Sequence, residues 1–179
     1  MKKPFIAAIA LLAATSIDSR ASAATEILGQ DAGTCSSGQG PAVLVNIVGL
    51  KDRVGELWVE LYPPNDDDFL RAEEELAAQG KVFRRTRAKA PATATASSVS
   101  MCIRAPRPGR YALLLRHNRT GQDKFALFSD GIGFPANTRL GRSRPKLRQA
   151  LIDVGTGMVT ANIKLQYLRG FVGFAPLQN

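Results

Sequence analysis

Apolar and polar residues alternate along most of the chain with the two-residue period of β-strands. The longest alternation covers residues 158–168, where apolar side chains from Val159 to Tyr167 take every second position. Such strict alternation predicts a half-buried strand in an antiparallel sheet. Shorter alternating or apolar segments predict further strands at residues 43–47, 56–62, 81–89, 98–104, 110–117 and 150–154.

About seven short strands, separated by turn residues and lacking a regular alternation with helices, predict an all-β fold. We expect an antiparallel β-sandwich that occupies residues 41–168. The short link 51–55 predicts that the strands on either side of it form a hairpin. Residues 65–79 break the alternation and predict one short helical insertion, capped by Asn65 or Asp66 and ended by Gly80.

The first 23 residues have the pattern of a secretory signal peptide. Lys2 and Lys3 precede the apolar segment 5–14, and Ala21-Ser22-Ala23 fits the small-residue cleavage site. We therefore expect cleavage near Ala23 and a mature protein in the periplasm or outside the cell. An N-terminal membrane anchor is the alternative, and the short apolar segment disfavours it.

Two segments flank the predicted sandwich. Residues 24–40 are polar and rich in Gly and Ser, which predicts an irregular N-terminal segment. Residues 169–179 form a C-terminal tail that either packs back on the domain or stays mobile.

The chain has two cysteines, Cys35 and Cys102, and an oxidising compartment favours a disulfide between them over two free thiols. The alternation around Cys102 directs it away from the core, so the bridge is expected to cross the outside of a sheet.

The chain is basic, with a formal net charge of +9, which favours anionic partners without specifying one. Two basic groups are candidate anion-binding sites for lipopolysaccharide, phospholipid or polysaccharide. One lies in the predicted strand 81–89, where an edge strand protected by charge is the favoured alternative. The other surrounds Pro145, where solvated side chains are the alternative. The two groups are Arg84, Arg85 and Arg87, and Arg139, Arg142, Arg144, Lys146 and Arg148.

The familiar catalytic patterns are missing. A single histidine, His117, excludes multi-histidine zinc sites, and no GxSxG elbow, P-loop or convincing dinucleotide fingerprint occurs. We therefore predict no catalytic, cofactor or metal site and no specific nucleic-acid partner. A hydrolase that uses His117 is the less favoured alternative. The turn after His117 has oxygen ligands in Asn118, Thr120 and Asp123, but Arg119 and Lys124 oppose the binding of calcium there.

Several motifs follow one another along the predicted sandwich. They are the opening segment VNIVGL, Gly55, Gly109-x-Tyr111-Ala112, the apolar strand ending in His117, Gly121, Gly131-x-Gly133-Phe134 with Asn137, Pro145 followed by Ala150, and the strand ending in Tyr167. Their order resembles the bacterial domain of unknown function 2141 (DUF2141) family of exported proteins, over roughly residues 42–168. The resemblance implies an exported single-domain protein with an immunoglobulin-like or prealbumin-like β-sandwich, and it implies no established activity or catalytic residue.

The turn after the histidine departs from the family pattern. Family members often have an acidic, Asn/Asp-rich turn there, whereas this chain has Asn118, Arg119, Thr120 and Gln122. A metal role guessed for the family is therefore not carried over. Tyr111 has a structural interpretation, because its hydroxyl can bond to the backbone at a sandwich corner.

The sequence thus predicts an exported, non-enzymatic β-sandwich protein, a binding or cell-envelope accessory protein that needs no cofactor. The alternative is a basic module that binds anionic envelope components. Its particular partner cannot be identified from residues alone, because a fold does not assign a function.

Overall fold

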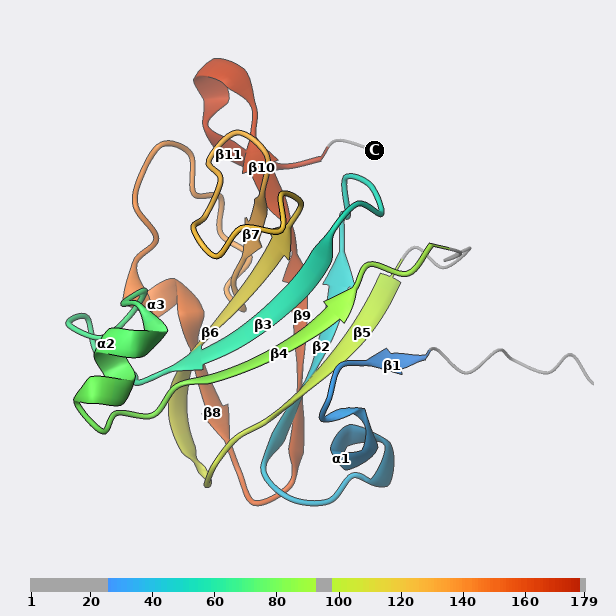
Figure 1. The fold of residues 1–179 in the computed structure, drawn as a ribbon, viewed down its shortest axis with the longest axis vertical. Coiled ribbons are helices and arrows are strands. Elements are labelled where there is room, and N and C mark those ends of the chain that lie inside the picture. The colour runs from blue at the N-terminus through green and yellow to red at the C-terminus, as the bar shows by residue number, and fades with distance from the viewer. Residues whose placement is uncertain (1–25, 93–97, 178–179) are drawn as a thin grey trace, which may run out of the picture.

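Two β-sheets pack face to face in a computed structural model that describes residues 26–92 and 98–177, and they confirm the predicted all-β sandwich (Figure 1). The predicted signal peptide lies outside the described residues. Seven of the strands in the described ranges have four residues or more, as predicted, and shorter strands extend the sheets. The four-stranded small sheet has the order β1 (Ile27–Leu28), β5 (Ser98–Arg104), β2 (Ala42–Val48) and β9 (Met158–Lys164).

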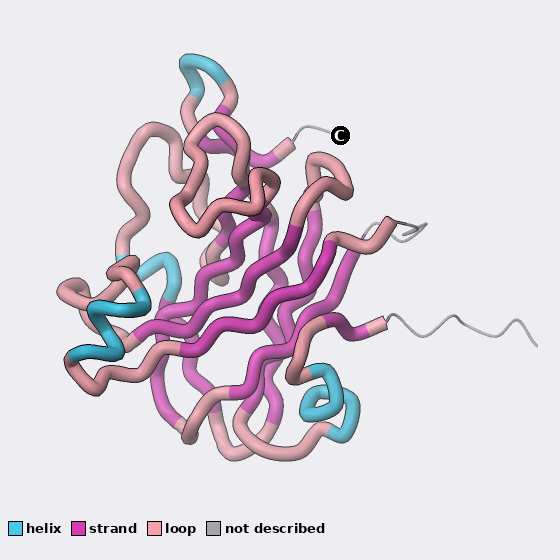
Figure 2. The backbone as a smooth tube through the Cα atoms, viewed as in Figure 1, coloured by secondary structure: helices cyan, strands magenta, loops and turns pink. Residues whose placement is uncertain are grey.

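The large sheet has seven strands, and loops and short helices lie around the ends of the strands (Figure 2). Strand β4 lies at one edge of this sheet, in agreement with the edge-strand interpretation of the basic segment 81–89. The order is β11 (Phe174–Pro176), β10 (Gln166–Leu168), β7 (Gly131–Gly133), β6 (Gly109–Asn118), β3 (Glu56–Tyr62) and β4 (Arg84–Lys89), with β8 (Leu151–Val154) paired to β6.

The main core lies between the two sheets. Alternate residues of β2, such as Val45 and Ile47, meet alternate residues of β3 and β6, such as Leu57 and Leu113, and all four are fully buried. Burying one aliphatic side chain of this size stabilises the fold by about 1.5–3 kcal/mol. The two-residue alternation gives each sheet one apolar face, and these two faces therefore pack against each other. The hydroxyl of Tyr111 donates to the carbonyl of Arg107 across 2.7 Å, which confirms its structural role at the corner.

The predicted hairpin of β2 and β3 is wrong. Strand β2 pairs with β5 and β9, whereas β3 pairs with β4 and β6 in the other sheet. The link 51–55 therefore crosses between the sheets, and both strands still direct their alternate apolar residues into one core. Gly55, with φ of 80°, turns the chain where its Cα lies against the backbone of Asn118, so a side chain has no room.

The single strand predicted at residues 158–168 is divided at Leu165. Strand β9 joins the small sheet and runs parallel to β2, not antiparallel, while β10 joins the large sheet beside β7 and β11. Ile163 and Tyr167 both face the same core, so the alternation continues through the crossing and hides it. The amide of Leu165 donates to the carbonyl of Val48, which holds the chain at the crossing.

Helices are shorter and more numerous than predicted. The helix in the 65–79 insertion is only α2 (Glu73–Ala78), because Leu70 adopts a positive φ of 66° and stops any earlier start. Asn65 caps a turn by accepting the amide of Asp68, and it does not cap the helix. Leu76 of α2 is buried and anchors the insertion on the large sheet. Another short helix, α3 (Leu147–Ala150), follows the basic loop around Pro145.

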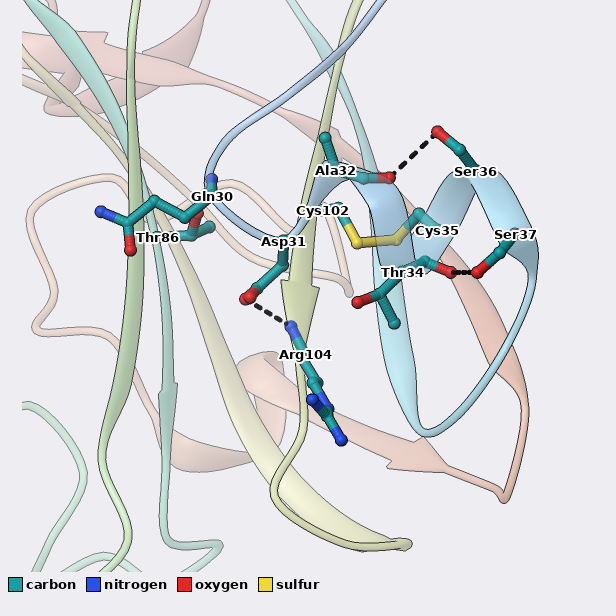
Figure 3. The surroundings of a disulfide bond; sticks show 10 residues. All are labelled: Gln30, Asp31, Ala32, Thr34, Cys35, Ser36, Ser37, Thr86, Cys102 and Arg104. Carbon is teal, nitrogen blue, oxygen red and sulfur yellow. Dashed lines mark hydrogen bonds between the residues drawn. A yellow bond between two sulfur atoms is a disulfide. The ribbon is translucent and has the colours of Figure 1, made fainter.

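The N-terminal segment is ordered, in contrast to the predicted irregular lead-in. It contains β1, which pairs parallel with β5, and the helix α1 (Ala32–Ser37). A Cys35–Cys102 disulfide, with a sequence separation of 67 residues, ties α1 to the outer face of the small sheet (Figure 3). Asp31 also accepts the amide of Arg104. The bridge and its position away from the core are as predicted.

The C-terminal tail packs back on the domain, one of the two alternatives left by the sequence. A one-turn 3-10 helix, η1 (Gly170–Val172), reverses the chain, and β11 then pairs antiparallel with β10. Phe174 of β11 is buried against the outer face of the large sheet. The tail thereby extends this sheet beyond the predicted end of the sandwich at residue 168.

Candidate functional site

A cavity of about 650 Å³ opens on the outer face of the large sheet, on the side away from the main core. Small-molecule sites commonly measure about 300–1,000 Å³, so its size fits an organic ligand. Its floor comes from β3, β4, β6, β7, β10 and β11. Its walls come from three loop segments, 70–73, 123–127 and 140–145.

Strand alternation explains the polar part of the floor. Glu60 and Tyr62 of β3 face outward because Leu57, Val59 and Leu61 face the core. Glu60 is directly opposite Arg85 of β4, and the adjacent strand β6 contributes Arg116 on the same face. The loops bury this outer face, so the charged groups at its base have little contact with water.

Glu60 is buried but fully paired. Its Oε1 accepts from Nε of Arg85 at 2.6 Å, and its Oε2 accepts from the hydroxyl of Tyr62 at 2.6 Å. Arg85 also binds Glu73 at 2.9 Å, which connects the floor to α2. Burial and the neighbouring Glu60 charge raise the pKa of Tyr62, so the phenol keeps its proton and remains a donor. These groups hold one another in place and do not offer a free carboxylate.

Arg116 holds the loop that forms one wall. Its guanidinium donates to Asp130 at 2.8 Å and also to the backbone carbonyls of Gln122, Asp123 and Lys124. Asp130 in turn accepts the amide of Ala126 at 3.0 Å. A buried arginine with several acceptors fixes the loop 119–130, and this loop positions Phe125 and Leu127 at the cavity.

Trp58 supports the same floor from the side. Its ring lies beneath the guanidinium groups of Arg85 and Arg116, each 4.8 Å from the ring centroid, and of Arg87, at 4.1 Å. The negative face of the indole stabilises cations placed this way, by about 0.5–2 kcal/mol each. Three like charges therefore share one outer face without repelling the strands apart.

The rest of the cavity combines apolar walls with a basic rim. Three exposed arginines, Arg71, Arg142 and Arg144, also line the cavity, and we call them its rim. Two further carboxylates line it: Glu73 is paired with Arg85 at 2.9 Å, and Asp123 lies 3.8 Å from Arg87. Gln166 positions one wall, since its side chain accepts the amide of Leu140 and donates to the carbonyl of Thr138. The apolar lining residues are Leu70, Leu114, Phe125, Leu127, Ile132, Leu140, Leu168 and Phe174.

The structure brings together part of each predicted anion-binding group. Arg85 of the first group and Arg142 and Arg144 of the second line the one cavity. The others lie elsewhere: Arg84 is exposed at the start of β4, and Arg87 stacks on Trp58. Arg139 donates to the carbonyl of Val172, and Lys146 and Arg148 line a separate hollow near Asp66.

Sequence reasoning missed Arg71, Arg116 and the floor residue Glu60. A signal for Arg116 was present, because it is a lone charge inside the apolar strand 110–117. A charge at such a position needs a buried partner, here Asp130. Arg71 gave no signal, because it is one of several charged residues in the segment 65–79, which was predicted as a helix.

His117 lies outside this cavity and is completely buried between the sheets. Its Nδ1 is 2.7 Å from the hydroxyl of Tyr167, and its Nε2 is 2.7 Å from the carbonyl of Val54. Burial lowers the pKa of His117, and the Val54 bond offsets only part of that effect. The ring is therefore neutral at neutral pH, and both of its nitrogens are occupied.

The polar turn after His117 is closed by its own hydrogen bonds. Asn118 Oδ1 accepts the amide of Gly121 at 3.0 Å, and Asn118 Nδ2 donates to Gln122. Arg119 binds Asp52 of the neighbouring link through both carboxylate oxygens. Partial burial raises the pKa of Asp52, but the hydrogen bonds from Arg119 and Val54 outweigh it and the pKa lies below its ordinary value.

The described residues hold neither a cluster of metal-ligating side chains nor a membrane-spanning helix. Within 26–92 and 98–177, no three His, Cys, Asp or Glu side chains come together as a metal site. In the same ranges, none of the helices has the length and apolar character needed to cross a membrane.

Comparison with known families identifies the chain. The profile of a bacterial family described as "Uncharacterized protein conserved in bacteria (DUF2141)" matches residues 45–162, more than half of the sequence. The chain belongs to this family. Comparisons with curated proteins and with solved structures find no match.

The motifs expected of a DUF2141 protein lie in the sandwich frame. A side chain at Gly131 would collide with the ring of Tyr167, and one at Gly133 would collide with Ile163. Asn137 accepts the amide of Lys164 at 2.7 Å. Close packing and this hydrogen bond explain Gly131, Gly133 and Asn137, and these three residues do not line the cavity, whereas Pro145 of the motifs does.

Proposed function

We propose that this DUF2141 protein is an exported, non-enzymatic binding protein whose outer cavity holds a small amphipathic molecule with an anionic head. One observation carries the proposal: a cavity of about 650 Å³ joins apolar walls to a rim of arginines. An alkyl or aromatic body would replace water against Leu114, Ile132 and Leu140. The anionic head would bind the rim.

The charges on the rim favour an anion over a cation. Among the described residues, no carboxylate lies within 4.0 Å of Arg142 or Arg144, so their guanidinium groups are available to a ligand. The buried Glu60 is already bound to Arg85 and Tyr62. Hydrogen bonds between arginine and a phosphate or carboxylate contribute about 1.5–3 kcal/mol each.

The proposed absence of catalysis rests on how the reactive residues are used. His117 is buried, with both ring nitrogens engaged by Tyr167 and Val54. Both cysteines are in the disulfide. Glu60 and Asp130 are each paired with an arginine, which removes them as available general bases.

A second candidate is a surface site for anionic envelope polymers. Arg144, Lys146 and Arg148 border a hollow beside α3, separate from the floor of the cavity. A polyanion such as lipopolysaccharide or an acidic polysaccharide would bind there through charge alone, with strong salt dependence. Because Arg144 belongs to both sites, substitutions must separate them.

Calorimetric titration with dodecyl phosphate, below its micelle concentration, tests the cavity. We expect binding that dodecyl maltoside, with the same chain and an uncharged head, does not reproduce. The double substitution R142Q/R144Q is expected to weaken binding at least tenfold, because two charge-assisted contacts are lost. The control substitution is R148Q, since Arg148 lies outside the cavity.

Each result decides between the sites. An unchanged affinity in R148Q supports the cavity, and an equal loss in R148Q supports the surface site instead. The bulky substitution S143W at the rim is expected to abolish binding without altering net charge. If wild-type protein fails to bind dodecyl phosphate, the proposed ligand class is wrong.

A further inference from the structure

Exposed apolar side chains are concentrated at one end of the molecule. In the described residues, six large hydrophobic side chains are exposed, and five of them fall in the segments 125–128 and 171–172. Phe171 is 94% exposed and Phe128 is 84% exposed. Scattered exposed apolar residues are ordinary, whereas such a concentration marks an interaction surface. We call Leu127, Phe128, Phe171 and Val172 the apolar tip.

The two segments of the apolar tip are held next to each other. The ring of Phe125 packs at 6.0 Å from the ring of Phe174, which follows directly on the η1 turn. The η1 turn itself is closed by hydrogen bonds between Arg169 and Gly173 and between Val172 and Arg169. Figure 1 shows this turn above β10 and β11, at the opposite end from the disulfide-bound α1. Phe171 is therefore presented by a hydrogen-bonded turn and not by a loose end.

Arginines border the apolar tip. The guanidinium of Arg142 lies 5.9 Å from the ring of Phe171. Arg139 donates to the carbonyl of Val172 at 3.3 Å, and Arg169 donates to the carbonyl of Pro176 at 3.2 Å. The nearby carboxylate of Asp130 is buried against Arg116. Among the described residues, none of these three arginines has a carboxylate within 4.0 Å, so their positive charges border the exposed Phe171 without an ion-pair partner.

We propose that the apolar tip docks onto the surface of an anionic lipid bilayer. Phe171 and Phe128 enter the boundary between headgroups and acyl chains, and Arg139, Arg142 and Arg169 bind lipid phosphates. Both parts match what a lipid surface recognises, which is shallow apolar insertion combined with positive charge. A second copy of the chain fits less well, because two basic tips on chains of net charge +9 repel each other.

The inference goes beyond the proposed cavity function. Leu127 and Arg142 belong to both surfaces, so the tests use other residues of the tip and its border. Phe171, Arg139 and Arg169 do not line the cavity, so substitutions there leave the cavity intact. Loss of vesicle binding with retained binding of dodecyl phosphate would therefore separate the two. Loss of dodecyl phosphate binding with retained vesicle binding would separate the two functions equally well.

Sedimentation with vesicles tests the docking. Purified protein is mixed with vesicles of phosphatidylglycerol and phosphatidylcholine in equal parts, or of phosphatidylcholine alone, at about 0.1 M salt. We expect stronger binding to the anionic vesicles. F171S is expected to weaken it roughly tenfold through lost apolar burial. R139Q/R169Q is expected to weaken it about 25-fold, at roughly fivefold for each charge near the surface.

Two controls make the result specific. R104Q/R107Q removes the same net charge at exposed positions away from the apolar tip, and it is expected to bind as wild type. The substitution F171W places a fluorophore on the tip, and its emission is expected to shift to the blue when anionic vesicles are added. An equal loss in R104Q/R107Q, or no shift in F171W, would overturn the proposal. So would a dimer that F171S converts to a monomer while wild-type protein ignores vesicles.

Discussion

The hydroxyl of Tyr167 donates to Nδ1 of His117 across 2.7 Å, in the interior of the sandwich. Nε2 of the same ring faces the carbonyl of Val54 at 2.7 Å and must carry the proton, because a carbonyl only accepts. The Tyr167 hydroxyl also accepts the amide of Lys51 at 3.1 Å. These hydrogen bonds connect β6, β10 and the link between the sheets. His117 is therefore a structural residue whose charge state affects the stability of the fold.

Acid is expected to destabilise the fold through His117. Burial lowers its pKa in the folded state, so on acidification the unfolded chain binds the proton first. The stability contributed by the neutral ring is present above the ordinary pKa of about 6.5 and is lost as pH falls toward the lower folded value. The loss is about 1.4 kcal/mol for each unit by which the pKa is lowered.

Thermal melting of wild-type protein and H117Q between about pH 8 and pH 5 checks this. Wild type is expected to lose melting temperature below about pH 6.5, and H117Q to be less stable overall with a flatter profile. Asp52, Arg119 and Asp130 are the charged groups that act on His117 and remain in both proteins. Parallel profiles would contradict the assignment.

Gly131 is required because the ring of Tyr167 occupies the space beside its Cα. G131A is therefore expected to destabilise the protein by about 1–3 kcal/mol through overpacking. Substituting the ring in G131A/Y167L should recover part of that loss, so the two effects are not additive. Denaturant unfolding measures both, with G157A as the control, because Gly157 has open space around it and no positive φ. A G157A loss as large as that of G131A would refute the packing explanation.

The disulfide is expected to stabilise the domain by fastening α1 to the small sheet. It joins residues separated by 67 positions, and loops of this length give about 4 kcal/mol in the chain-entropy model. C35S/C102S should lower the melting temperature, and reduction should lower that of wild type but not that of the variant. Thiol titration of unreduced, denatured protein is expected to find no free sulfhydryl. Two free thiols would remove this explanation of the ordered N-terminal segment.

The alternation of residues determined which strands exist, but not how they are arranged. Residues 43–47 and 56–62 were correctly predicted as strands. Their separate sheets were not predictable, because both strands direct apolar side chains into the same core. The division of residues 158–168 was hidden for the same reason. A two-residue period reports the face of each side chain and carries no information on which strand lies beside it.

The cavity was out of reach for a related reason. Glu60 and Tyr62 occupy the outer face of β3, which the pattern assigns to solvent, and distant loops bury them. Only the contact of loop 119–130 with Arg116, and of loop 138–140 with Gln166, creates the walls. Those contacts join residues far apart in the sequence, and no periodic pattern of residue types predicts them. The disulfide, in contrast, was predictable, because two cysteines allow a single pairing.

Arg116 is expected to control the wall of the cavity. R116Q would leave Asp130 buried without its charged partner, and breaking one side of a buried pair costs about 3–5 kcal/mol. It would also release the carbonyls of Gln122, Asp123 and Lys124, so the loop 119–130 should open. Limited proteolysis is expected to cut R116Q within this loop and to spare wild type. The control R110Q removes an exposed arginine of the same strand, paired with Asp153 at the surface, and should leave both the loop and the stability of the domain close to wild type. If R116Q keeps an uncut loop and wild-type stability, the buried Arg116–Asp130 pair does not hold the wall.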